Sequence, residues 1–231
     1  MSLIDKLFGG GKMPSGPASP PPPPPEVLAA ELLAGLERVY TNQRGIHAES
    51  LLCALGALSG FGCQMAVRAL VKLGQVPAQG AFVVAETAEG PFYFGDQLNQ
   101  PLLEAQMSVW AQVAGAAKAA GAAELPDIND IAAFVAGSVG GPQFGTLRVP
   151  EENQPHQTPF EALRTQWPAA WAHIQARHGD PSFTGWYFAM AAAQVLPQMK
   201  AVLEPGLATR IVMEAAVAMA KIDPKRIGVE A

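Results

Sequence analysis

The sequence has few charged residues, few cysteines and no concentration of positive charge. Only 15% of its 231 residues are charged, against roughly 25% in typical soluble domains, so much of the chain must be buried. The net charge of −5 and the scattered lysines and arginines provide no basic surface of the kind that binds nucleic acid. We therefore expect no nucleic-acid partner.

The two cysteines, Cys53 and Cys63, are expected on one helix. Ten residues of helix separate their Cα atoms by about 15 Å, which is beyond the reach of a disulfide. Both are therefore interpreted as small apolar core residues. The N-terminus lacks the long apolar stretch of a signal peptide, and the expected location is the cytoplasm.

Residues 51–67 and 181–199 are long stretches without a charge. Both are at the short end of the roughly 20 residues that cross a bilayer. Each also contains glycine together with glutamine or proline, as in Gly56, Gln64 and Pro197. Buried core helices explain these stretches better than membrane spans.

The remaining pattern predicts a mainly α protein, a compact multi-helix domain around a buried central helix with one short β-hairpin. Helices are expected over residues 26–40, 46–73, 101–120 and 128–137, then after Thr158, Asp180 and Glu204. Pro168 is expected to divide the helix that follows Thr158 into two pieces. Residues 46–73 are apolar on nearly every side, which is typical of a central helix. Two β-rich runs around a glycine turn predict the hairpin near residues 81–94.

Residues 1–25 differ from this single helical domain, which spans residues 26–231. Leu3, Ile4, Leu7 and Phe8 have the spacing of one helical face, and glycines and a run of six prolines follow them. A helix of this length is unstable alone in water. We therefore expect residues 2–8 to dock on a protein partner or on a second copy of the chain. A membrane surface is less favoured because only Lys6 and Lys12 supply positive charge.

Two short motifs resemble metal sites but lack essential parts. His47-Ala48-Glu49 is half of the zinc deaminase signature, and the required Pro-Cys-x-x-Cys is missing. Asp127-Ile128-Asn129-Asp130 opens like a calcium loop, but Ala132 occupies the position that needs glycine. We predict no metal site and no cofactor, and we interpret Asp127 as a helix cap.

Several polar residues lie where helices are expected to begin or end. If they converge, they form a small polar pocket at one end of the helical domain. The alternative, which we favour, is that each side chain caps its own helix. The candidate ligand-binding residues are Arg44, His47, Glu49, Asp96, Asn99 and Asp130, and the candidate catalytic residues are His47, Glu49 and Asp127.

The sequence thus supports two hypotheses about function. The first is a non-enzymatic interaction or adaptor protein that docks through its tethered N-terminal peptide. The second is a small-ligand-binding protein, or a metal-assisted or acid–base hydrolase, that uses the polar residues at the helix ends. The second requires His47 and Glu49 to meet at least one of Asp96, Asp127 and Asp130.

Overall fold

A computed structural model describes residues 22–230 of the chain. The predicted docking residues Leu3, Ile4, Leu7 and Phe8 lie outside the described residues. The helices are α1 (Pro25–Tyr40), α2 (Ala48–Lys72), α3 (Asp96–Asn99), α4 (Val109–Ala120), α5 (Ile128–Ser138), α6 (Pro159–Ala176), α7 (Thr184–Met199) and α8 (Pro205–Met219). Short π or 3-10 segments are η1 (Gln100–Glu104), η2 (Glu151–Asn153), η3 (Pro181–Phe183) and η4 (Pro224–Ile227).

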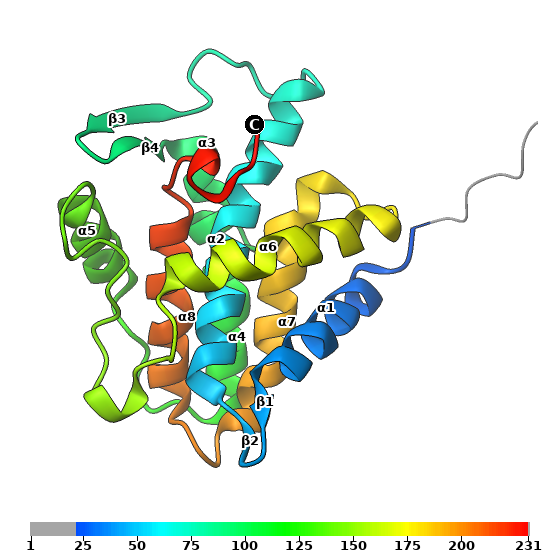
Figure 1. The fold of residues 1–231 in the computed structure, drawn as a ribbon, viewed down its shortest axis with the longest axis vertical. Helices are drawn as coiled ribbons and strands as arrows, with labels where there is room; N and C mark the ends of the chain where they lie inside the picture. The colour runs from blue at the N-terminus through cyan, green and yellow to red at the C-terminus, as the bar shows by residue number, and fades with distance from the viewer. Residues whose placement is uncertain (1–21, 231) are drawn as a thin grey trace, which may run out of the picture.

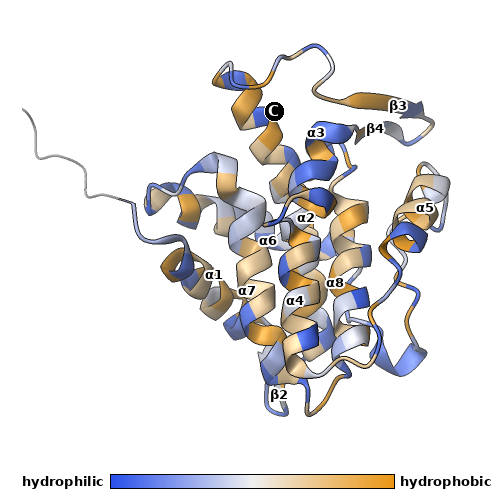
Figure 2. Ribbon diagram, turned by 180° about the vertical axis from the view of Figure 1, so that it is seen from behind, coloured by the Kyte–Doolittle hydropathy of each residue, from blue (hydrophilic) through white to orange (hydrophobic). Residues whose placement is uncertain are grey.

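Helix α2 is the centre of the fold, as the sequence predicts. It packs against α6, α7 and α8, while α4 contacts α7 and α8, and α1 lies along α7 (Figure 1). By length and composition α2 could cross a membrane, but 94% of its most apolar window is buried inside the protein. Figure 2 shows hydrophobic residues concentrated on the helices of this central layer and polar residues on many of the connections. The predicted buried core helix is therefore confirmed.

Glycine allows the central helices to approach very closely. A Cβ atom added to Gly60 would lie 1.9 Å from the carbonyl oxygen of Ala216 in α8, and one added to Gly56 would lie 2.3 Å from that of Val212. On another side of α2, Gly62 meets the backbone of Gly185 in α7. The core thus relies on backbone-to-backbone contact of helices, in agreement with the alanine- and glycine-rich composition.

The β structure consists of two small antiparallel hairpins. The predicted one is confirmed as β3 (Val83–Thr87) paired with β4 (Gly90–Phe94), in a register that places Val83 opposite Phe94. It is fixed to the helices where the Tyr93 N–H donates to the carbonyl oxygen of Lys221, at 2.8 Å. A second hairpin, β1 (Thr41–Asn42) with β2 (Gly45–Ile46), occupies the junction between α1 and α2. The sequence pattern predicted the first of these hairpins and did not include the second.

Two predicted helix boundaries also differ from the structure. Pro168 lies inside a continuous α6, because losing one hydrogen bond is offset by burial of Trp167, Ala170 and Ile174 around it. The helix expected from Pro101 begins only at Val109, after the Ser108 hydroxyl caps it by accepting the Ala111 N–H. Residues before Ser108 form α3 and η1 instead. The capping box of Thr158 and Glu161 is present as predicted.

Candidate functional site

The longest connection without regular strands or α-helices runs from α5 to α6, over residues 139–158, and contains only the short η2. Long irregular loops in compact domains are usually functional or mobile. This loop is held by polar contacts from several helices. The Asn153 amide donates to Glu49 at 3.2 Å, the His156 N–H donates to the Ser50 hydroxyl at 2.9 Å, and the Tyr40 hydroxyl donates to the Gln157 side chain at 3.2 Å. The loop is therefore fixed to α1 and to the start of α2.

The predicted pair His47 and Glu49 lies beneath this loop. Nδ1 of His47 accepts the Ser50 N–H at 3.3 Å, which caps α2, and lies 3.6 Å from a carboxylate oxygen of Glu49. The His156 ring packs on the His47 ring with 3.7 Å between centroids. Burial lowers the pKa of His47, and the neighbouring His156 lowers it further, against the opposing effect of Glu49. A neutral His47 whose Nδ1 accepts a backbone N–H acts as a cap and a loop support.

Other predicted residues lie in three further places. Asp96 and Asn99 belong to α3, at the end of the molecule opposite the β1–β2 hairpin that precedes His47 (Figure 1). Asp127 caps α5 by accepting the Asn129 N–H at 2.8 Å. Arg44 is exposed in the β1–β2 turn, where its own N–H donates to the Asn42 side chain. The structure therefore brings His47 together with Glu49 and does not bring Asp96 or Asn99 to them.

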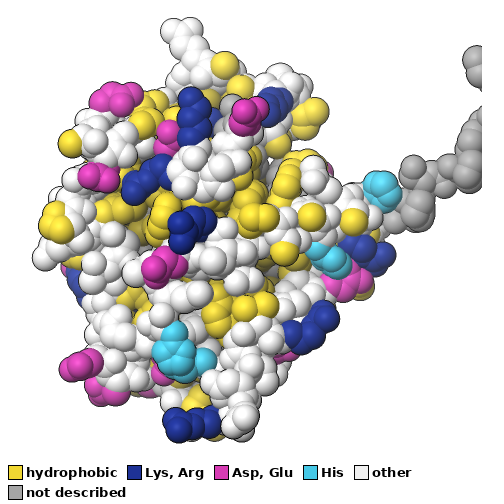
Figure 3. Space-filling view, in the orientation of Figure 1, with side chains coloured by type: hydrophobic (Ala, Val, Ile, Leu, Met, Phe, Trp, Pro, Cys, Tyr) yellow, Lys and Arg dark blue, Asp and Glu magenta, His cyan; other side chains and the backbone are white. Residues whose placement is uncertain are grey.

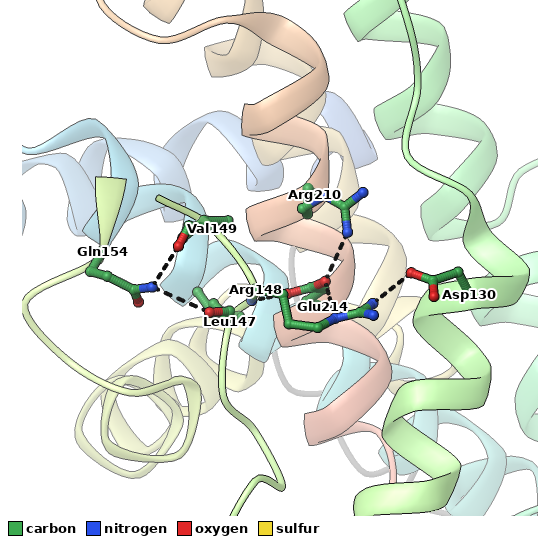
Figure 4. A network of polar contacts seen from close by, with 7 residues as sticks. All are labelled: Asp130, Leu147, Arg148, Val149, Gln154, Arg210 and Glu214. Carbon is green, nitrogen blue, oxygen red and sulfur yellow. Dashed lines mark hydrogen bonds and ion pairs between the residues drawn. The ribbon is translucent and has the colours of Figure 1, made fainter. Parts of the chain in front are cut away.

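Asp130 takes part in a different network, centred on Glu214 of α8 (Figure 4). Glu214 is only 2% exposed. One of its oxygens accepts the Arg148 N–H at 2.6 Å, and the other accepts Arg148 Nε at 3.0 Å and Arg210 Nη1 at 3.2 Å. Arg148 also pairs with Asp130 at 2.9 Å and lies 4.2 Å from the centre of the Phe134 ring. The network ties the loop and α5 to the central α8.

The sequence analysis did not identify Glu214. A visible signal was its position as the single acidic residue within the otherwise apolar run of residues 211–220. A buried charge is retained only when it is paired, so such a residue predicts a partner from another element. The arginine one turn earlier, Arg210, supplies part of that pairing, but the partner from the loop, Arg148, becomes apparent only from the tertiary structure.

The loop forms one wall of a groove made of two adjoining hollows of about 460 and 410 Å³. Both hollows are lined by Pro142, Phe144 and Arg226. We name the combined space the Arg226 groove. The larger hollow extends to the start of α6 and the end of α8, and the smaller one extends to the β3–β4 hairpin. The space-filling view shows hydrophobic side chains in recesses of one face, between scattered Lys, Arg, Asp and Glu side chains (Figure 3).

Aromatic rings surround the guanidinium of Arg226. Its central carbon lies 5.2 Å from the centre of the Phe160 ring and 5.9 Å from that of Phe92, and Phe92 meets Phe144 edge-on at 4.8 Å. Within residues 22–230, no carboxylate oxygen lies within 4 Å of Arg226. Glu161 lines the larger hollow and Glu89 the smaller one. Glu161 is engaged in its own capping box, and the hydrogen bonds from Thr158 lower its pKa.

Comparison with protein-family models, with curated proteins and with solved structures gives no match. The interpretation of the site therefore rests on its own geometry.

Other chemistry that the sequence raised has little support in the described part of the chain. Residues 22–230 contain no group of three His, Cys, Asp or Glu side chains that could hold a metal ion. Cys53 and Cys63 are free and buried, and burial raises the pKa of each thiol to about 12. Since the thiolate is the nucleophile, both thiols are inert at neutral pH.

Proposed function

We propose that this protein is a non-enzymatic, cytoplasmic interaction protein that docks through residues 2–8, which are tethered to a rigid helical domain. The observation that carries the proposal is the way α1 packs. Leu28, Leu32, Leu33 and Leu36 are all buried against the body, so the core is closed from Pro25 onward. We propose that the apolar side chains of Leu3, Ile4, Leu7 and Phe8, which lie outside the described residues, dock on a partner.

Helix α1, from which the N-terminal segment extends, is held in place by ion pairs. Glu31 of α1 pairs with His173 at 2.9 Å and with Arg177 at 3.0 Å, both near the end of α6. Burial by itself would raise the pKa of Glu31, but the hydrogen bonds and charges of His173 and Arg177 outweigh it and lower that pKa. The chain before α1 is exposed at Pro22 and Pro24. A proline-rich segment in an extended conformation advances about 3.1 Å per residue, so we propose that the chain before α1 serves as a spacer for residues 2–8.

We expect residues 2–8 to bind a protein surface, which belongs to a different protein or to a second copy of this chain. About two turns of helix with four apolar side chains can fill a groove on a partner, in the way that an amphipathic helix lays its apolar face into a hydrophobic groove. The same segment binds a bilayer weakly, because a single short stripe with two lysines provides little area and little charge.

Full-length protein, a Leu7→Asp/Phe8→Asp variant and a matched Asp5→Asn/Lys6→Gln variant test this proposal. The first variant places charge on the apolar stripe, and the second changes only the polar face. We expect the apolar-face variant to lose the self-association measured by light scattering, or the stoichiometric partner that co-purifies with tagged protein, while the polar-face variant keeps it. All three proteins should share one melting temperature.

Two outcomes would overturn the proposal. One is equal association in the three proteins, which would show that the stripe has no role in it. The other is a monomeric wild type without a stoichiometric partner.

A further inference from the structure

We infer that the Arg226 groove is a binding site for a small molecule that combines an apolar, preferably aromatic, body with one carboxylate. This site is separate from the docking of residues 2–8 and does not depend on it. Its ligand chemistry follows from three features of the groove, namely its fixed shape, its single positive charge and its aromatic walls.

The shape of the groove is fixed before any ligand arrives. The loop that forms one wall is held by the contacts of Arg148 with Glu214. It is also held by the hydrogen bonds from Asn153 to Glu49 and from the His156 N–H to Ser50. Within the loop, the Gln154 side chain donates to the carbonyl oxygens of Leu147 and Val149 at 3.2 and 3.0 Å (Figure 4). A site that is already ordered loses less entropy on binding, and a hollow of about 460 Å³ is in the usual size range for small ligands.

The positive charge of the groove comes from one guanidinium, and the acidic residues Glu161 and Glu89 line the larger and the smaller hollow. Arg226 is the single Lys or Arg among the described residues that line the two hollows, and no carboxylate of residues 22–230 is paired with it. An arginine fork matches the two oxygens of a carboxylate. A polyanion such as nucleic acid would need several such contacts, which this lining does not offer.

Aromatic and aliphatic side chains select an apolar body for the same ligand. Phe92 and Phe160 flank the guanidinium, and Phe144 and Met219 line the larger hollow. The faces of the flanking rings attract the guanidinium, while Arg226 itself is exposed to solvent and therefore accessible to a ligand. A ligand whose carboxylate meets Arg226 therefore has apolar surface on each side against which its body can pack.

Binding of phenylacetate, followed by protein-observed NMR or calorimetry, tests this inference, with phenylacetamide as the uncharged analogue. The matched variants are Arg226→Gln, which removes the charge in the groove, and Lys225→Gln, which removes a neighbouring exposed charge that does not line it. We expect wild type and the Lys225 variant to bind phenylacetate with a Kd of about 1 mM or tighter. The amide, and the Arg226 variant with the acid, should bind at least about tenfold more weakly.

Several results would overturn the inference. Equal affinity for the acid and the amide, or equal affinity of wild type and the Arg226 variant, would show that the guanidinium does not recognise the ligand. Inorganic phosphate that binds as tightly as phenylacetate would show a site for a bare anion, without selection for an apolar body. Absence of binding at a phenylacetate concentration of about ten times the expected Kd would show that the groove is not such a site.

Discussion

Replacing Lys221 by methionine should stabilise this protein at neutral pH, and the gain should disappear at alkaline pH. Lys221 follows α8 and is only 4% exposed, with its ammonium nitrogen 5.1 Å from the centre of the Phe94 ring. Among residues 22–230 no carboxylate oxygen lies within 4 Å of it. Burial lowers the pKa of Lys221 from 10.5 to about 8, although the nearby Cys63 opposes this.

The size of the effect follows from that pKa. A change of one in pKa corresponds to about 1.4 kcal/mol, so the buried charge costs the folded state about 3 kcal/mol at pH 7. Methionine fills the space of the aliphatic stem without a charge. Below pH 8 the variant should therefore gain up to about 3 kcal/mol, or about 6–12 °C in Tm for a chain of this length.

The pH dependence has a definite direction. Between about pH 8 and 10.5, Lys221 is deprotonated in the folded protein but still protonated in the unfolded chain. The unfolded state then binds more protons, so the stability of the wild type rises with pH across this range. The variant lacks this contribution, and its advantage should fall toward zero near pH 10.5.

Urea denaturation of wild type and variant at pH 7, 9 and 10.5 measures the effect. Burial also raises the pKa of Tyr40 and of both thiols to about 12, so the informative quantity is the difference between the two proteins at each pH. An exposed lysine, Lys225, provides the matched control Lys225→Met, for which the difference should stay flat. A Lys221 variant that is no more stable at pH 7, or whose advantage is independent of pH, would refute this reasoning.

Two further predictions concern packing and the buried ion pairs. Gly60→Ala should destabilise the protein by about 3 kcal/mol or more, because the new methyl group would lie 1.9 Å from the Ala216 oxygen. At Gly35 in α1 nothing lies within 4 Å of an added Cβ atom. Gly35→Ala should therefore stabilise the protein by about 0.5–1 kcal/mol. Thermal unfolding of both variants tests this, and similar losses in the two would contradict the close approach of α2 and α8. Glu214→Ala should lower the free energy of unfolding by about 3–5 kcal/mol, because it leaves two arginines without their buried partner. Asp130→Asn, at the exposed edge of the same network, should have a small effect. Chemical denaturation measures both losses, and equal losses would contradict this prediction.

The parts of the fold that could be predicted are those fixed by local chemistry. The apolar run that became α2, the Thr158 capping box and the β-rich segments of β3 and β4 each carry their signal within a few residues. Predictions failed where distant contacts outweighed a local rule. Pro168 is accommodated because Trp167 before it and Ala170 and Ile174 after it are buried. Residues 101–107 leave the helical path that Pro101 was expected to start.

The same distinction applies to the candidate sites. His47 and Glu49 are neighbours in sequence, and their proximity could be predicted, as could the capping role of Asp127. The ring contact between His156 and His47 joins residues about 110 positions apart, and the ion pair between Arg148 and Glu214 joins residues 66 positions apart. No local sequence pattern indicates either contact. The same holds for Arg226, which meets Phe92 and Phe160 from two other elements.

The sequence by itself determined the helical class, the central position of α2, the close packing of small residues and the separate character of residues 1–25. These follow from composition and periodicity, which act on each segment independently. Only the tertiary structure decided which polar residues meet, because a groove or an ion-pair network depends on the relative placement of several elements. Asp96 and Asn99 were therefore not brought to His47, and Arg226, a residue without any notable local pattern, came to lie between aromatic rings in a hollow of about 460 Å³.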